Sequence, residues 1–234
     1  GIEVTLRIDN RENILGFLAR NEVDLVMMGR APNTLDCEAT AFATNPLGIV
    51  CAPDHPLSRR KRVQFEMLKD YGFVVREQGS GTRAAMERLF GQHDIKPKVV
   101  MEMPSNETIK QAVMAGMGLS FLSLRTVRHE LAAGHLALVD INGMPLVGHW
   151  YVTHLSHKKL SPAAKAFKAA KACAYNHNPR QGTSCRPVVA RSRALRARGG
   201  DQRFAISFFG TLRYVDIGVE ALGAVAAGGD QRAG

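Results

Sequence analysis

The chain has 234 residues, of which 45% are hydrophobic and 22% are charged, a composition typical of a soluble globular protein. It contains no stretch of about 18 uncharged apolar residues, so we expect no transmembrane helix, and it does not start with the basic and apolar runs of a signal peptide. The net charge of +10 is scattered, without a basic stripe or interleaved aromatic residues, so we expect that this chain does not itself read DNA.

The first part of the chain predicts strands connected by a helix. Residues 3–8 alternate polar and apolar side chains, which is typical of a half-buried strand. Asp9 and Asn10 then supply the N-cap chemistry of a short helix, and further strands are predicted at residues 23–29 and 47–52. The apolar face of that helix consists of Ile14, Leu15 and Leu18. Strand–helix–strand order at this spacing indicates a parallel α/β layer.

A second unit of the same kind begins near Tyr71. Strands alternate with helices there, and Ser105 is a good N-cap for one of the helices. The predicted strands are residues 73–75, 99–103, 119–123, 136–139 and 149–153. The other predicted helices are residues 83–90, 126–133 and 162–172.

The composition changes after Ala172. Residues 173–234 hold nine Arg, no Lys and four acidic residues, whereas residues 1–172 hold 22 Lys plus Arg and 17 acidic residues. The Arg-rich stretch 187–200 has no clear period, so we predict a disordered tail whose removal leaves the stability of residues 1–172 almost unchanged. One strand over residues 204–214 is an alternative for part of this tail. A genuine segment and a frame-shifted end of the gene both fit the composition.

Neither the cysteines nor the histidines predict a metal site. No cysteine belongs to a C-x-x-C pair, so we expect reduced and mostly buried thiols at Cys37, Cys51, Cys173 and Cys185. Three histidines lie five and three positions apart, without a paired acid, at His149, His154 and His157. We therefore expect no metal, no cofactor and no catalytic constellation.

The segment 79–83, Gly-Ser-Gly-Thr-Arg, lies between a predicted strand and a predicted helix. Helix N-termini carry unsatisfied N–H groups and a partial positive charge, so they attract anions. Gly81 lets the backbone approach a ligand closely, Ser80 and Thr82 add hydroxyl groups, and Arg83 adds a charged fork. The alternative, which the spacing alone favours, is a plain helix cap at Thr82. The segment matches neither the phosphate-binding P-loop nor the G-x-S-x-G nucleophile elbow.

A second polar junction follows the next predicted strand, at Ser105 and Asn106. Taken alone, it favours a helix cap in which Ser105 satisfies backbone donors. Two such junctions at the carboxyl ends of strands in one α/β unit nevertheless indicate a ligand site, because open α/β sheets bind ligands at that edge.

Four segments carry a family resemblance: residues 24–30, 52–58, 76–83 and 105–123. They resemble the effector-binding domains of LysR-type transcription regulators, and the resemblance covers about residues 3–170. The sequences of residues 76–83 and 105–123 are most similar to the CbbR subgroup, the regulators of Calvin-cycle (RuBisCO) operons, with CysL/CysB-like regulators as close neighbours.

This resemblance implies an α/β fold of the type 2 periplasmic-binding-protein kind, with two Rossmann-like subdomains around a cleft. Subdomain I would comprise residues 1–72 and 149–172, subdomain II residues 73–148, and residues 173–234 would form the tail. The chain would cross between subdomains near residues 70–73 and 148–150. Because the chain starts with Gly1, we expect a fragment that lacks the family's first strand and helix, its winged helix-turn-helix and its linker helix.

The resemblance also implies the function of an effector sensor, not an enzyme, in a cytoplasmic regulator of carbon-fixation genes. The effector would be a small anionic metabolite, DNA would be bound only through the missing helix-turn-helix, and the full-length protein would be a homo-oligomer without membrane contact. The alternative is a solute-binding protein of a transport system with the same fold. Carried over position by position, the cleft would be lined by Asn10, Arg30, Ser80, Gly81, Thr82, Arg83, Ser105 and Asn106.

Overall fold

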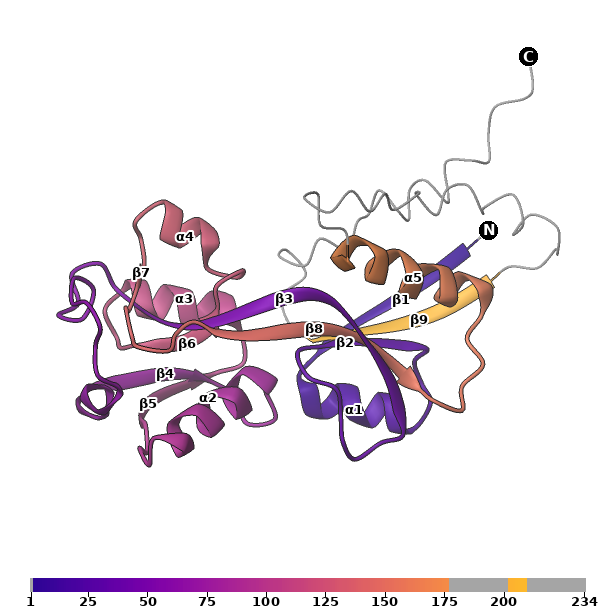
Figure 1. Cartoon of the computed structure of the whole chain (residues 1–234), viewed down its shortest axis with the longest axis horizontal. Coiled ribbons are helices and arrows are strands. Elements are labelled where there is room, and N and C mark those ends of the chain that lie inside the picture. The colour runs from indigo at the N-terminus through magenta and orange to yellow at the C-terminus, as the bar shows by residue number, and fades with distance from the viewer. Residues whose placement is uncertain (1, 177–201, 210–234) are drawn as a thin grey trace, which may run out of the picture. The chain divides into compact units, whose positions relative to one another are not determined.

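The computed structural model describes residues 2–176 and 202–209, and Figure 1 shows the course of the chain. The chain divides into two compact units. Of the described residues, the first contains 2–9, 13–43, 150–176 and 202–209, and the second contains 10–12 and 44–149. Among the described residues, no helix is long and apolar enough to cross a membrane.

The first crossing between the units lies inside strand β3 (Cys37–Cys51), not at residues 70–73 where the resemblance places it. β3 is 15 residues long and contributes Phe42 to the core of the first unit and Ile49 to a core of the second. A single strand therefore serves two cores. The sequence pattern predicts only residues 47–52 as a strand, because the first half of β3 mixes polar and small residues without a clear period.

Four strands pair side by side in the sheet of the first unit. Hydrogen bonds join its strands in the order β1 (Ile2–Asp9), β9 (Gln202–Phe209), β2 (Leu25–Met28) and β8 (Leu146–Leu155). β9 is parallel to both β1 and β2, whereas β8 is antiparallel to β2. The helices of this unit are α1 (Arg11–Ala19), which connects β1 to β2, and α5 (Pro162–Asn176), which follows β8.

The core of the first unit is formed by side chains of α1, β2, β8 and α5. Ile14 and Leu18 are fully buried and Leu15 packs against the cluster, which confirms the apolar face predicted for α1. All four residues of β2 are buried, as expected for a central strand that is covered on both faces. The remaining members of this core include Trp150, Val152, Leu155, Ala164 and Phe167.

The second unit contains two small strand groups with helices packed against them. β3 pairs antiparallel with β6 (Ser120–Ser123) and β7 (Ala137–Leu138), and β4 (Gly72–Arg76) pairs in parallel with β5 (Lys98–Met103). The helical elements are η1 (Phe65–Asp70), α2 (Gly81–Gln92), α3 (Asn106–Met114) and α4 (Arg128–Ala132). The order β4–α2–β5–α3–β6 is the strand–helix alternation that the sequence predicts.

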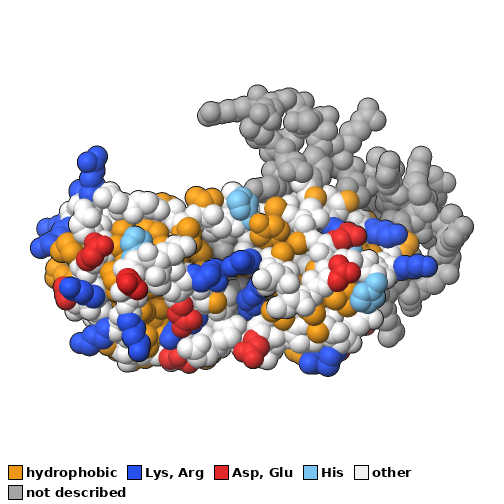
Figure 2. All heavy atoms as spheres, turned by 60° about the horizontal axis from the view of Figure 1, so that its bottom comes forward, with side chains coloured by type: hydrophobic (Ala, Val, Ile, Leu, Met, Phe, Trp, Pro, Cys, Tyr) orange, Lys and Arg blue, Asp and Glu red, His pale blue; other side chains and the backbone are white. Residues whose placement is uncertain are grey.

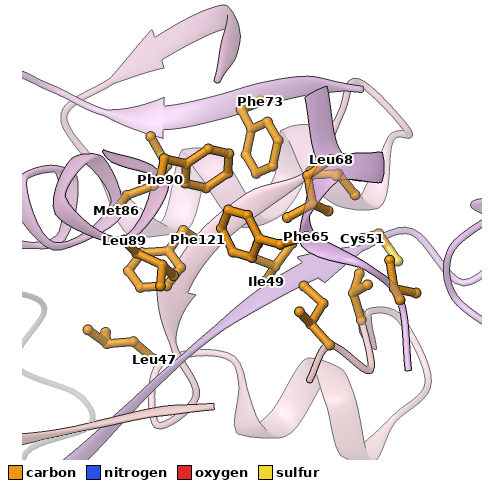
Figure 3. Close-up of a cluster of buried hydrophobic side chains, with 14 of the residues drawn as sticks. Leu47, Ile49, Cys51, Phe65, Leu68, Phe73, Met86, Leu89, Phe90 and Phe121 are labelled. Atoms are coloured by element: carbon orange, nitrogen blue, oxygen red, sulfur yellow. The ribbon is translucent and has the colours of Figure 1, made fainter. Parts of the chain in front are cut away.

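Aromatic side chains fill one core of the second unit (Figure 3). Phe90 of α2 is fully buried, and its ring centroid lies 4.9 Å from that of Phe65 and 5.2 Å from that of Phe73, both edge-on. Such edge-to-face pairs add to the stabilisation from buried area. These contacts hold α2 against β4, so they also set the position at which α2 begins.

Part of the segment after residue 172, which the sequence predicts to be a disordered tail, forms regular secondary structure. α5 continues to Asn176, and residues 202–209 form β9, whereas the sequence predicts a strand only over residues 204–214. The pairing of β9 with two neighbours supplies the order that its weak sequence pattern does not indicate. The rest of the predicted tail lies outside the described residues.

Candidate functional site

Both predicted ligand-binding junctions belong to the second unit, at one edge of the β4–β5 pair. The register of this parallel pair aligns Arg76 with Met103, the last residues of the two strands. The Glu77 N–H then donates to the Met103 carbonyl at 3.2 Å. Because parallel strands end at the same edge, the polypeptide segments that enter α2 and α3 start next to each other.

Ser80 is the N-cap of α2, and its side chain is left without a partner. It has extended backbone angles (φ −72°, ψ 134°) and makes no side-chain cap hydrogen bond. The residue is only 1% exposed, and its buried Oγ has no hydrogen-bond partner among the described residues. A buried hydroxyl without a partner costs about 1–3 kcal/mol, so this orphaned group is a position where an added polar ligand atom would be stabilised.

The first turn of α2 adds backbone donors to this hydroxyl. α2 begins at Gly81, so the interpretation of Thr82 as a plain helix cap is wrong. The first intrahelical bond at this end runs from the Ala84 N–H to the Ser80 carbonyl at 3.0 Å. The N–H groups of Gly81, Thr82 and Arg83 therefore have no carbonyl acceptor within the helix, and the positive end of the helix dipole lies at the same place.

The second junction is a regular helix cap with one further polar group. The Ser105 Oγ accepts a hydrogen bond from the Glu107 N–H at 3.2 Å, which confirms the cap interpretation of Ser105. Asn106, the first residue of α3, is 8% exposed, and its Oδ1 accepts a hydrogen bond from Arg76 Nη1 at 3.1 Å. The hydroxyl of Ser105 is thus engaged in the cap, whereas Asn106 connects the two junctions.

Arg76 joins the two junctions, and the sequence analysis missed it. Its guanidinium is almost fully buried, and Nε and Nη2 donate to both carboxylate oxygens of Glu77 at 2.7 and 2.9 Å. Such a bidentate pair is geometrically specific as well as strong. A charged residue at the end of an apolar strand, three positions before the Gly-Ser-Gly turn begins, is the signal that could have identified it.

Arg83 is engaged within the protein in this structure. Nε donates to Glu87 Oε1 at 2.6 Å, and Nη1 donates to the Arg76 carbonyl at 3.2 Å and to Glu102 Oε2 at 3.4 Å. The Gln78 N–H contacts the other oxygen of Glu102 at 3.4 Å. Arg83 therefore ties α2 to the ends of β4 and β5, and it neutralises carboxylates around the α2 N-terminus.

Of the other two predicted site residues, one lies beside the first junction. Asn10 belongs to the second unit, and a Cβ on Gly79, in the turn before α2, would lie 3.6 Å from its Nδ2. Arg30 is an exposed residue after β2 in the first unit. The second unit by itself therefore brings together the residues 80–83 and 105–106. On the face drawn in Figure 2, basic and acidic side chains are interspersed.

A buried lysine fixes α3 from its other side. Lys110 is 1% exposed, and its Nζ lies 2.8 Å from Glu107 Oε2 and 2.7 Å from Glu130 Oε1. Burial lowers the pKa of Lys110, but the hydrogen bonds and charges of Glu107 and Glu130 outweigh it, so that the pKa lies above its usual value. Burial raises the pKa of Glu130, but the hydrogen bond and charge of Lys110 outweigh it, so that this pKa lies below its usual value. This ion-pair cluster holds α3 and α4 together.

The histidines and cysteines have structural surroundings. His154 is buried, with Nδ1 2.9 Å from the Leu155 carbonyl and Nε2 2.9 Å from Lys168 Nζ. Cys37 and Cys51 are free thiols, and burial, with a smaller effect of Asp54, raises the pKa of Cys51 to about 11. The side chains of the other two cysteines lie outside the description. No group of three His, Cys, Asp or Glu side chains in the described residues is arranged to hold a metal ion.

Comparison with known proteins gives one consistent family. The family described as "LysR substrate binding domain" matches residues 1–171. The RuBisCO operon transcriptional regulator of Acidithiobacillus ferrooxidans is 46% identical over 167 residues, which cover 71% of this chain and 54% of that protein. The regulator CbbR of Rhodospirillum rubrum is 45% identical over 169 residues, which cover 72% of this chain and 56% of CbbR. The chain thus spans about half the length of these curated relatives.

A solved structure extends the comparison to the fold. The regulatory domain of CcmR from Synechocystis PCC6803, in complex with 2-PG, superposes with a TM-score of 0.71 and 31% identity, and the match covers 76% of this chain and 98% of that domain. The effector-binding domain of QuiR in complex with shikimate has a TM-score of 0.66 at 20% identity, which shows the fold alone. These likenesses confirm the predicted α/β fold of LysR effector-binding domains.

Proposed function

The chain belongs to the LysR substrate-binding domain family, and from that premise we propose that it senses a small anionic effector at the paired helix N-termini of its second unit. The single observation that carries the site assignment is the buried Ser80 Oγ, which has no hydrogen-bond partner among the described residues, at the N-terminus of α2. The curated relatives are transcription regulators, not enzymes.

An anion suits this site because its unused polar groups are donors. Backbone N–H groups at the start of α2, the Ser80 and Thr82 hydroxyls and the Asn106 amide nitrogen are all able to donate hydrogen bonds. The nearby full charges give no net positive charge, since Arg76 pairs with Glu77, Arg83 pairs with both Glu87 and Glu102, and the Glu12 carboxylate lies beside Gly79. The attraction for an anion would therefore come mainly from the helix dipole and the oriented donors.

The cellular role follows from the relatives. Because the relatives are named as RuBisCO operon and CbbR regulators, we assign this chain to the control of carbon-fixation genes. DNA would be read by a part of the regulator that these 234 residues do not include. The bound 2-PG of the CcmR domain makes that molecule the first effector to test.

The test is a calorimetric titration of the whole chain with 2-PG, in parallel with inorganic phosphate. We expect saturable binding of 2-PG. In Ser80→Ala the affinity should fall by about fivefold or more, because a typical hydrogen bond contributes about 1 kcal/mol and one to a charged group contributes about 1.5–3 kcal/mol. Ser161→Ala is the matched control, since the Ser161 Oγ accepts from the Ala164 N–H at 3.2 Å in the first turn of α5.

The two serine variants separate the site from a structural effect. Ser161→Ala should lower stability by about 1 kcal/mol and leave the affinity unchanged. Ser80→Ala should leave stability the same or higher, because it removes an unsatisfied buried hydroxyl. Equal affinity of Ser80→Ala and the parent chain for 2-PG would contradict the assignment of the site.

A further inference from the structure

A run of four basic residues lies in the second unit, in the connection between β3 and η1. It is the longest uninterrupted run of Lys and Arg in the chain, and all of its residues are exposed. The run, called the basic loop from here on, consists of Arg59, Arg60, Lys61 and Arg62. The positive charge of the chain is therefore concentrated at this place, whereas the sequence analysis treated it as scattered.

Both ends of the basic loop are anchored in the second unit. Leu57 and Val63 are buried, with exposed fractions of 0% and 2%. The Leu57 N–H donates to His55 Nδ1 at 3.1 Å, and the Val63 N–H donates to the Asp140 carbonyl at 2.7 Å. Only Ser58 and the basic loop lie between these two anchors. The four charges are thus held at the surface on a short, fixed connection.

Most of the charge in the basic loop is uncompensated. Lys61 Nζ lies 3.8 Å from Asp140 Oδ2, and the Lys61 side chain remains 84% exposed, so this contact contributes little. Arg60 Nη1 contacts Met67 Sδ at 3.9 Å, which is a neutral partner. Within the described ranges, neither Arg59 nor Arg62 pairs with a carboxylate. Three guanidinium groups are therefore available to an anionic partner.

The backbone of Arg62 is strained. Its φ of 50° lies in the left-handed region, which costs a residue with a Cβ about 1–2 kcal/mol relative to the right-handed region. Glycine would adopt this conformation without that cost. Strain of this kind often accompanies function, and an arginine at this position is explained if its side chain binds a partner.

We propose that the basic loop contacts the phosphate backbone of duplex DNA, beside the site that another part of the regulator reads. The curated relatives include HTH-type transcriptional regulators, so DNA is the polyanion that a regulator of this kind meets. The planar fork of an arginine matches the oxygens of a phosphate, and a lysine adds a point charge. Phosphate contacts carry no sequence information, which agrees with the expectation that this chain does not read DNA.

Duplex DNA fits the density of charge in the basic loop. An acidic protein segment is the competing partner, because carboxylates also accept the arginine fork. Duplex DNA carries one negative charge per about 1.7 Å of its axis, so adjacent basic residues meet several phosphates at once. An acidic segment would need a run of carboxylates to offer the same density.

The basic loop and the candidate effector site lie toward opposite ends of β4. The loop leads through η1 to Gly72, the first residue of β4, whereas Ser80 comes after Arg76, the last residue (Figure 1). A strand of this length spans about 15 Å. DNA contact and effector binding thus use different residues, and either one can be tested without the other.

The experiment measures the fluorescence anisotropy of a short labelled duplex of random sequence, titrated with the whole chain. Residues 173–234 hold nine further Arg, so every comparison is between variants of the same chain. When Arg59, Arg60 and Arg62 are all replaced by Gln, we expect at least about a tenfold loss of affinity at about 50 mM salt. The slope of log affinity against log salt should decrease in magnitude by about two to three, since each lost phosphate contact removes about 0.9. An unchanged salt slope would overturn the DNA contact.

A charge-matched variant separates the basic loop from net charge. Lys98, Lys159 and Lys165 are exposed and lie far apart in the sequence, and their joint replacement by Gln removes the same charge. This control should lose clearly less affinity than the loop variant, and an equal loss would show that net charge alone attracts the DNA. Replacement of the three arginines of the loop by Lys should retain most of the affinity, because the charges remain. All three variants should melt at the temperature of the parent, since the replaced side chains are exposed.

Two further ligands test the kind of partner. A promoter duplex should bind no more tightly than the random duplex, because phosphate contacts do not depend on sequence. Labelled poly-glutamate should distinguish DNA from an acidic protein, and the loop variant should lose much less affinity for it than for DNA. An equal loss for poly-glutamate and DNA would assign the basic loop to an acidic protein and overturn the assignment to DNA.

Discussion

Replacement of Arg83 by Ala tests whether charge balance around the α2 N-terminus controls effector binding. In the structure the guanidinium neutralises Glu87 at 2.6 Å and Glu102 at 3.4 Å. Arg83→Ala leaves both carboxylates uncompensated beside the proposed anion site. The variant should therefore weaken 2-PG binding even if Arg83 never touches the effector.

The magnitude follows from the change in charge. One unit of charge about 8 Å from a bound anion contributes about 2 kcal/mol at an effective dielectric constant of about 20, and salt reduces this to about 1–2 kcal/mol. We expect about a tenfold loss of affinity, because 1.4 kcal/mol corresponds to a factor of about ten. Thr82→Val removes one neutral hydroxyl, so it should cost about fivefold.

The assay is a titration calorimetry series with 2-PG at two salt concentrations, with a melting curve for each variant. The loss in Arg83→Ala should shrink as salt rises, whereas the loss in Thr82→Val should not. Glu87→Gln is the control on the same helix, because it removes a negative charge and should not weaken binding. Unchanged affinity in both Arg83→Ala and Thr82→Val would refute the anion site at this helix terminus.

Three further predictions concern stability and DNA. Lys110→Met should lower the free energy of unfolding by about 2–4 kcal/mol at neutral pH, because it leaves Glu130 without its buried partner; chemical denaturation measures this. The stabilisation by this ion pair should be lost in acid, as the pH falls below 4.5 through the lowered pKa of Glu130, and in base, as the pH rises above 10.5 through the raised pKa of Lys110. A difference between variant and parent that stays the same at every pH would contradict this. Phe90→Ala should lower the free energy of unfolding by about 3–5 kcal/mol, because it opens a cavity in an aromatic core. A decrease below about 1 kcal/mol would show that the core relaxes around the cavity. Finally, this chain should not retain promoter DNA above scrambled DNA at physiological salt in a mobility-shift assay, and specific retention would overturn the assignment of DNA reading to another part of the regulator.

Local patterns predicted the elements whose stabilising contacts are themselves local. The apolar face of α1 follows from its helical period, and the buried residues Ile14 and Leu18 confirm it. Ser105 was recognisable as an N-cap because a cap needs only one side chain and the N–H two positions later. The same holds for the two strand ends, since β4 and β5 are bounded by polar turns in the sequence.

The features that the sequence did not indicate depend on distant partners. β3 extends from Cys37 because its first half is ordered by the first unit's core, which a local period does not reveal. β9 is a strand because β1 and β2 offer it pairing on both edges. Its order therefore reverses the expectation for the tail, and cutting the chain after Asn176 should destabilise the first unit.

The geometry of Arg76 adds a reason why the candidate site would select anions. A guanidinium has donors only, so the Asn106 atom that Arg76 Nη1 contacts must be the amide oxygen. The amide nitrogen of Asn106 is thereby turned away from Arg76 and remains a donor at the start of α3. Glu77 in turn holds the guanidinium in place through both of its oxygens. An acidic side chain thus helps to build an anion site indirectly, because it orients the arginine that orients the amide. Arg76→Lys, which keeps the charge but loses the fork, should release the Asn106 amide and weaken 2-PG binding, and an unchanged affinity would show that this orientation has no part in recognition.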